Sequence, residues 1–336
     1  MVRDMAQQLP VKIAGLGWYL PQRRVSSAEL AQQLKVAPGV IERTTGVFER
    51  RYASGETASG MGAAAARMAL EHAGMECDDL DAIIGASSAP QQCIPCTAAL
   101  VQRELHAPEG RSLCFDINAT CLSFLIALHT AAQFITAGVY RTVLVYSSEI
   151  ASPSLNPSQW ESAALFGDAA AAALLTRSAP GEASTIWHAQ FATYSSGADL
   201  TQCLGGGTLH HPNDPRTTPD MNQFQMQGLA VFRQAVRIMR PFLDQFFETL
   251  GWQREQVDSV VPHQASRHGV EQLSDRFGFR DEQVFTNLRE RGNCVAASIP
   301  LALAEAVHIG RIQRNDRVVL LGTGAGLTVG ALALTF

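Results

Sequence analysis

A cysteine in the segment Asn118-Ala-Thr-Cys121 stands where an expected strand passes into a strongly apolar helical run. Backbone N–H groups without partners and the positive end of the helix dipole both stabilise a thiolate at such a junction. The thiolate is the form of cysteine that attacks an acyl group. Cys121 is therefore the candidate nucleophile, with a small buried core cysteine as the alternative interpretation.

A histidine and an asparagine lie in two later segments that could assist this chemistry. His263 follows an apolar run that ends at Pro262, and α/β proteins build sites at strand ends. A neutral imidazole there could donate to a developing oxyanion or relay a proton, although a core or capping histidine is also consistent. Asn293 follows Gly292 at the start of an alanine-rich helical run. Its amide could donate to a carbonyl or simply cap the helix.

A glycine-rich turn, Leu321-Gly-Thr-Gly-Ala-Gly-Leu, joins two apolar runs close to the last residue. Glycines allow backbone N–H groups to approach a ligand closely. A dinucleotide-binding turn is excluded because no helix is expected after it. We expect Gly324 and Ala325 to form a loop that stabilises an oxyanion, with a plain tight turn as the alternative.

The elements that position these residues come from an internal duplication. Three anchors recur at nearly one spacing: Gly74 and Gly251 (177 positions apart), Asn118 and Asn293 (175), and Thr142 and Val318 (176). Alternating apolar strands and helices predict sheets that are covered by helices. We predict two halves, 1–178 with Cys121 and 179–336 with His263, Asn293 and the glycine loop. A pseudo-twofold relation would bring these side chains together between the halves.

The pattern places the elements as follows. Helices are expected at 57–74, 121–137, 226–250 and 294–309, and strands at 80–86, 112–117, 141–147, 257–261 and 316–321. The polar stretch 205–222 is long enough to be a lid over a site.

Composition excludes several classes of protein. The 336 residues are 46% hydrophobic and 17% charged with a net charge of −5, and no basic block suggests a nucleic-acid partner. Without a signal-peptide pattern or an apolar run of ~18 residues, we expect a cytoplasmic protein without membrane helices. The pair Cys93-x-x-Cys96 has no second pair beside it, so neither a metal site nor a cofactor is predicted.

The chain resembles the thiolase superfamily, in particular its β-ketoacyl-acyl-carrier-protein synthase III branch, over nearly its whole length. The motifs that carry the resemblance are Thr120-Cys121, His263-Gln-Ala, Gly292-Asn293, Phe166-Gly-Asp168, Thr45-Gly46 with Glu49-Arg50-Arg51, and Gly322–Gly330. The resemblance implies an α/β protein with a duplicated five-layer αβαβα fold and a homodimer. It also implies acyl-coenzyme A or acyl-carrier-protein thioesters as substrates, with an acyl carrier protein as a candidate partner. Arg50, Arg51 and the pair Arg289/Arg291 are candidate contacts for such an acidic carrier.

The family chemistry is a two-step condensation. Cys121 would take an acyl group, and a malonyl-type thioester would lose carbon dioxide and attack it. His263 and Asn293 would hold the second thioester carbonyl, and the N–H groups of Cys121 and of the glycine loop near Ala325 would hold the first oxyanion.

Departures from the family pattern concern mainly the coenzyme A end. Ala325 replaces a glycine and Cys294 a serine or threonine. Residues that bind coenzyme A in the family fall on Val40, Thr44, Trp160 and Leu229 here, so we expect its adenine site to be rebuilt or lost. Phe232, Ser266 and Ile94 are the predicted substrate contacts. The His263 motif also resembles olefin-forming thiolases, but these carry a glutamate at the position of Ile94.

Two further functions remain open from the sequence. One is acyl transfer to an oxygen or nitrogen nucleophile, with His263 as the general base. The other is a non-catalytic partner subunit of a heterodimeric synthase, which the changes at Ala325 and Cys294 suggest. The complete set of Cys121, His263 and Asn293 argues against that second alternative.

Overall fold

Two mixed β-sheets with the same internal order form the frame of the molecule. A computed structural model describes residues 8–336. The first sheet has the order β1-β7-β6-β4-β5 and the second the order β11-β12-β13-β8. The bounds are β1 Val11–Tyr19, β4 Ala82–Gly85, β5 Leu113–Asp116, β6 Thr142–Glu149, β7 Ala169–Arg177, β8 Thr185–Thr193, β11 Ser259–Pro262, β12 Arg317–Gly324 and β13 Thr328–Thr335.

The strand pairing repeats between the two sheets. β4 is parallel to β6, β6 is antiparallel to β7, and β7 is antiparallel to β1. The series β11, β12, β13 and β8 repeats these relations in the same order. The duplication predicted from the sequence is therefore present in the topology. The second half lacks a full counterpart of β5, because a single bridge between Val260 and Val284 stands in its place.

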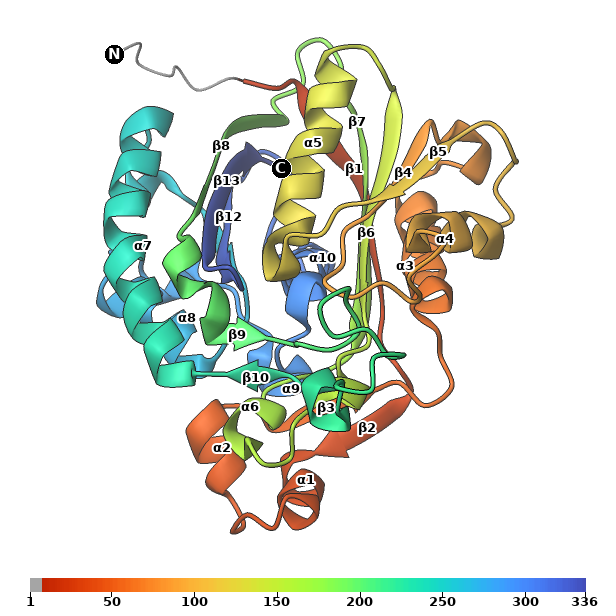
Figure 1. The fold of residues 1–336 in the computed structure, drawn as a ribbon. Coiled ribbons are helices and arrows are strands. Elements are labelled where there is room, and N and C mark those ends of the chain that lie inside the picture. The colour runs from red at the N-terminus through yellow and green to blue at the C-terminus, as the bar shows by residue number, and fades with distance from the viewer. Residues whose placement is uncertain (1–7) are drawn as a thin grey trace.

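Three pairs of helices complete five layers (Figure 1). Their bounds are α3 Ala58–Ala73, α4 Thr97–Leu105, α5 Ser123–Thr136, α7 Gly228–Leu250, α8 Arg267–Asp275 and α10 Ser298–His308. Helices α3 and α4 cover the outer face of the first sheet, and α7 and α8 cover that of the second. Helices α5 and α10 lie between the sheets. The expected αβαβα arrangement is confirmed.

Each layer boundary is an apolar core. The central core joins side chains of α5 and α10 to strands of both sheets, and Leu128 and Leu303 are fully buried in it. Two further cores lie under α3 and α4 and under α7 and α8. Because helices cover both faces, β6 is buried at every position, including its polar residues Ser147 and Ser148.

Both central helices begin later than the sequence predicts. Short 3-10 turns, Thr120–Leu122 and Val295–Ala297, precede α5 and α10. In each turn a β-branched residue adopts a left-handed backbone, with φ of 52° at Thr120 and 51° at Val295. Such residues rarely do so without a compensating role in a site. Cys121 therefore lies in the turn before α5 and not in the helix.

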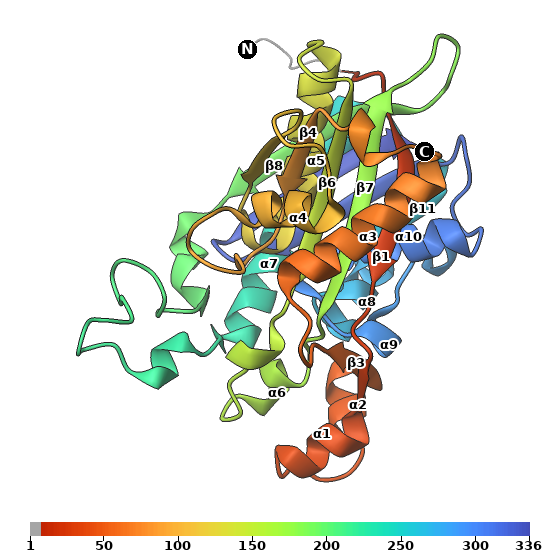
Figure 2. The same cartoon turned by 90° about the vertical axis from the view of Figure 1, so that its right-hand side faces the viewer.

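Smaller elements pack below the sheets. They are β2 Arg23–Ser26, α1 Ser27–Gln33, α2 Val40–Thr45, β3 Glu49–Tyr52, α6 Trp160–Ala163, β9 Thr201–Gln202, β10 Gln225–Met226 and α9 Leu288–Arg291. Figure 2 shows the segment between β9 and β10, which contains the predicted lid 205–222, projecting from the body of the protein. Across residues 8–336, every helix is too short or too polar to cross a membrane.

Candidate active site

A cavity of about 410 Å³ lies where the two halves meet, and Cys121, His263 and Asn293 all line it. Cys121 comes from the turn before α5, and His263 directly follows β11. Asn293 comes from the segment before α10. The structure thus brings together three side chains that are far apart in the sequence. We call this space the main cavity.

The thiol of Cys121 is in an environment that disfavours its charge. Cys121 remains partly accessible, yet burial of the sulfur and, to a lesser extent, the Glu149 carboxylate together raise the pKa of the thiol to about 12. The backbone N–H groups of Cys121 and Ala325 act in the opposite direction. The expectation that a helix N-terminus holds a thiolate is therefore wrong for the free protein. Helix α5 begins only at Ser123, and desolvation outweighs the two N–H donors.

Those two N–H groups lie at the predicted oxyanion loop and at the nucleophile, and their role there stays a prediction. They come from opposite halves and both interact with the sulfur of Cys121. Gly324 makes this approach possible, since an added Cβ would lie 2.7 Å from Thr120 Oγ1 and 3.5 Å from Cys121 N. Ala325 does not adopt a positive φ, so its methyl group causes no backbone strain. The alanine is therefore compatible with the loop.

His263 is held as a neutral imidazole. It is 6% exposed, and burial lowers its pKa to about 4. Its Nδ1 is buried without a hydrogen-bond partner among residues 8–336, whereas the ring lines the main cavity. A proton on Nε2 then makes this nitrogen a donor towards the cavity.

Asn293 is fixed by its neighbours on both sides. Its Oδ1 accepts from Val295 N at 2.9 Å, and its Nδ2 lies 3.5 Å from the carbonyl oxygen of Ala265. Since Oδ1 is used within the turn, an Nδ2 hydrogen is left to face the cavity. Asn293 therefore fixes the turn before α10 and does not cap the helix itself, whose N-cap is Ala297.

The same arrangement occurs in the first half. Asn118 Oδ1 accepts from Thr120 N at 2.9 Å, and its Nδ2 donates to Ser88 O at 2.8 Å. Asn118 and Asn293 are 175 positions apart, as are Thr120 and Val295. The duplication therefore extends to individual hydrogen bonds. By this spacing the counterpart of Cys121 is Ala296.

The Phe-Gly-Asp turn positions the Asn293 segment. Asn293 N donates to Leu165 O at 2.7 Å, and Gly167 N donates to Asn293 O at 3.0 Å. An added Cβ at Gly167 would lie 2.2 Å from the carbonyl oxygen of Arg291, and one at Gly292 would lie 2.6 Å from Leu165 O. Only glycine permits these two backbones to approach so closely.

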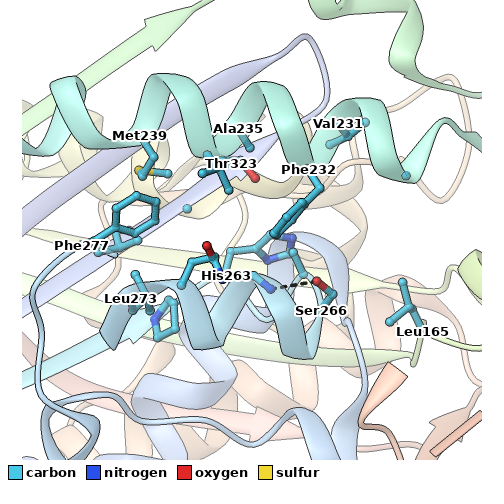
Figure 3. A pocket seen from close by; sticks show the side chains of 18 of the residues that line it. Leu165, Val231, Phe232, Ala235, Met239, His263, Ser266, Leu273, Phe277 and Thr323 are labelled. Carbon is cyan, nitrogen blue, oxygen red and sulfur yellow. Dashed lines mark hydrogen bonds between the residues drawn. The ribbon is translucent and has the colours of Figure 1, made fainter. Parts of the chain in front are cut away.

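A second cavity of about 150 Å³ adjoins the main one between α7 and α8. Phe232 and Ser266, two of the predicted substrate contacts, line it together with His263 (Figure 3). His263, Leu165 and Val231 line both cavities. The two spaces meet at the histidine, so a long thioester could extend from one to the other. We call the smaller space the side cavity.

Other predicted contacts lie elsewhere. Ile94 is 84% exposed and lines neither cavity. Trp160 packs with Ile41 in a small apolar cluster, and Leu229 is 74% exposed. The resemblance assigned coenzyme A contacts to the positions of Trp160 and Leu229, and the structure gives the tryptophan a packing role.

The predicted arginine contacts for a carrier protein need correction. Arg50 is completely buried and donates to Ser27 Oγ at 3.0 Å and to Ala164 O at 2.8 Å. Arg291 is bonded to Glu305 at 2.8 Å. Of these residues, Arg289 presents a largely exposed side chain. Burial could not be read from a local stretch of charged residues.

The sequence did not lead us to predict several residues that line the main cavity. Glu149 ends β6 and lines the cavity although it is only 1% exposed. Phe166 and Phe224 form an edge-to-face pair, with ring centroids 4.9 Å apart, on its apolar wall. A charged residue at the end of a strand that is buried at every position is the signal that could have identified Glu149. Nothing local distinguished Phe224 from an ordinary loop residue.

Comparisons with known proteins agree with this geometry. Two family models match, "3-Oxoacyl-[acyl-carrier-protein (ACP)] synthase III" over residues 115–195 and the model of its C-terminal part over residues 247–336. The β-ketoacyl-[acyl-carrier-protein] synthase III of Clostridium acetobutylicum is 32% identical, covering 96% of this chain and 98% of that one. Synthase III 3 of Streptomyces coelicolor is 35% identical, covering 96% of each.

A solved structure shows the same fold over nearly the whole chain. The 3-oxoacyl-[acyl-carrier-protein] synthase III of Aquifex aeolicus VF5 superposes with a TM-score of 0.88 and 35% identity, covering 97% of this chain and all of that one. Sequence, fold and the arrangement of the cavity agree. The chain therefore belongs to the 3-oxoacyl-[acyl-carrier-protein] synthase III family of thiolase-fold condensing enzymes.

Proposed function

We propose that Cys121 is the acyl-carrying nucleophile of a decarboxylative condensation between an acyl thioester and a malonyl-type thioester. The observation that carries the proposal is the meeting of Cys121, His263 and Asn293 at one cavity with two backbone N–H donors at the sulfur. The substrates would be acyl-coenzyme A or acyl-carrier-protein thioesters, and the chemistry needs no cofactor.

In the first half-reaction, the sulfur of Cys121 attacks the thioester carbonyl. The N–H groups of Cys121 and Ala325 hold the oxyanion, because they already point at the sulfur. The bond to the departing sulfur breaks, and the thiol proton of Cys121 ends on the carrier thiol. The thiol, not a stored thiolate, is the resting state, so proton loss is coupled to attack.

In the second half-reaction, the malonyl-type thioester occupies the side cavity and the space at His263. His263 Nε2 and Asn293 Nδ2 donate to its carbonyl oxygen. Loss of carbon dioxide leaves an enolate, which those donors stabilise. The enolate carbon attacks the acyl carbon, the Cys121 thioester bond breaks, and one proton from water restores the thiol.

The direct test is the intact mass of the protein after incubation with acyl-coenzyme A and acyl-carrier-protein thioesters from acetyl to dodecanoyl. We expect an acyl adduct that Cys121→Ala abolishes and Cys203→Ala keeps, since Cys203 also lines the main cavity. Addition of malonyl-carrier-protein should release carbon dioxide and discharge the adduct. An adduct that persists in Cys121→Ala would sink the assignment. Discharge by an amine or alcohol, with no carbon dioxide released, would instead indicate simple acyl transfer.

A homodimer is proposed on the basis of the exposed sheet edge. β5 is the last strand of the first sheet, Leu113 on it is 52% exposed, and the nearby loop presents Ile94. Unpaired strand edges with apolar side chains are usually covered in the native protein. Light scattering that gives the mass of a single chain would contradict this assembly.

A further inference from the structure

Glu149 is a buried carboxyl group at the main cavity for which the proposed chemistry has no role. It lies at the end of β6 beside Ser88, Ala89 and Cys121 in the cavity wall. Burying a carboxylate is costly unless several donors compensate it. The surroundings of Glu149 supply such donors from two other segments of the chain.

The first segment follows β4. Ser88 N donates to Glu149 Oε1 at 2.5 Å, Ser88 Oγ donates to Oε2 at 2.9 Å, and the Ala89 N–H also points at the carboxylate. The second segment is the turn before α10, from which Ala296 N donates. A single side chain therefore ties two loops of opposite halves to the end of β6.

The second segment also carries Asn293. Within it, Val295 N donates to Asn293 Oδ1, and the next N–H, that of Ala296, donates to Glu149. By the 175-residue spacing, Ala296 is the counterpart of Cys121. In the first half, the backbone N–H of Cys121 faces the nucleophilic sulfur. Its counterpart in the second half, the N–H of Ala296, donates instead to the Glu149 carboxylate.

We propose that Glu149 is a positioning residue for the second half-reaction, in which its carboxylate clamps the Asn293 turn against the Ser88–Ala89 segment and so aims the Asn293 amide at the malonyl-type thioester. This inference rests on the proposed function. It assigns no bond-making step to Glu149.

The carboxylate has a second effect, on the nucleophile. Its charge raises the pKa of Cys121. Burial raises the pKa of Glu149 itself to about 7, against the hydrogen bonds from Ser88, Ala296 and Ala89. The titratable groups around it are Cys121, the buried Cys294, which its charge also affects, and His263 across the cavity. Removing the charge should therefore favour the Cys121 thiolate while loosening the Asn293 turn.

The two half-reactions should thus respond differently to Glu149→Gln. The amide is close in size but carries no charge and has a single acceptor oxygen for these donors. We expect Cys121 to be acylated as fast as in the wild type or faster, and its alkylation by iodoacetamide to begin at lower pH. Condensation of the preloaded acyl-enzyme with malonyl-carrier-protein should slow by at least about tenfold.

The experiment is a rapid-quench measurement of both half-reactions by intact mass, with the pH profile of Cys121 alkylation measured in parallel. Glu149→Asp keeps the charge but shortens the reach, so it should slow condensation without shifting the alkylation profile. Glu109→Gln removes an exposed charge distant from the cavity and should change neither.

Two results would overturn the proposal. Condensation at the wild-type rate in Glu149→Gln would show that the clamp is not needed. An equal loss of both half-reactions, with an unshifted alkylation profile, would show a merely structural role. Absence of any Cys121 adduct in the wild type would instead overturn the proposed function, and this inference with it. That outcome can be distinguished from the two results above, in which the wild type still forms the adduct.

Discussion

At the scale of single residues, desolvation is the largest cause of the pKa shifts of Cys121, Glu149 and His263. Burial raises the pKa of Cys121 to about 12 and that of Glu149 to about 7, and it lowers that of His263 to about 4. At neutral pH, the thiol and the imidazole are both uncharged in the free protein. A neutral histidine can donate from Nε2 to an enolate oxygen without bringing a second buried charge into the cavity.

The depressed pKa of His263 makes the folded protein sensitive to acid. The unfolded chain takes up a proton below about pH 6.5, whereas the folded state resists protonation until about pH 4. The stability from the neutral imidazole is therefore complete above about pH 6.5 and is lost as the pH falls towards 4. The loss is at most about 3 kcal/mol.

We therefore expect His263→Gln to lose less unfolding free energy than the wild type between pH 7 and pH 4. Guanidinium unfolding curves at a series of pH values measure this difference. His268→Gln, which changes an exposed histidine on α8, is the control and should follow the wild type. Equal slopes for His263→Gln and the wild type would contradict the prediction.

At the scale of elements, the turns before α5 and α10 position the chemistry. Both have a left-handed β-branched residue, and both are fixed by an asparagine whose Oδ1 accepts from the N–H two residues later. The loop between β12 and β13, in the second half, supplies the Ala325 N–H that interacts with the sulfur of Cys121. This arrangement depends on glycine at Gly324, where a side chain would meet the Thr120 turn.

Gly324→Ala should therefore displace the Cys121 turn and slow acylation of Cys121. We expect a loss of at least about tenfold in acylation rate, because positioning errors near one ångström cost that much or more. Acyl-adduct formation followed by mass measures the effect, and circular dichroism checks that the fold is kept. Gly207→Ala is a matched control, since nothing lies within 4 Å of its added Cβ. Acylation of Gly324→Ala at the wild-type rate would contradict this role of the loop.

At the scale of the whole molecule, the two predicted halves share one central core. Side chains of α5 from the first half and α10 from the second pack in the same cluster, together with strands of both sheets. Neither 1–178 nor 179–336 could keep that surface buried alone. The halves are thus repeats in sequence and topology, and we expect them to unfold as one cooperative unit.

Leu128→Ala tests this cooperativity. Leu128 is completely buried in the central core, so its truncation should cost about 2–5 kcal/mol. The loss should appear as one shifted denaturant transition by both fluorescence and circular dichroism, because tryptophans such as Trp18 and Trp252 report on both halves. Ile309→Ala, at a 67% exposed position, should change stability by less than about 0.5 kcal/mol. Two separate transitions would instead show that the halves are independent domains.

The sequence by itself determined the repeat, the identity of the elements and the short list of candidate residues. A spacing of 175 to 177 residues, apolar runs in the strands and glycines at fixed positions are properties of the local chain. They were sufficient to predict sheets covered by helices and the positions of Cys121, His263 and Asn293 at element ends, whereas the five-layer arrangement was implied by the resemblance to the family. The catalytic roles of these residues are predictions that the acylation experiments test.

Only the tertiary structure decided how these residues are surrounded. The left-handed turn at Thr120, the complete burial of Arg50 and the carboxylate clamp of Glu149 each depend on backbone from distant segments. For the same reason, the pKa of Cys121 is raised, whereas a position at a helix N-terminus led us to expect a lowered value. A helix N-terminus is visible in the local sequence, whereas desolvation is the sum of atoms that folding brings around the sulfur.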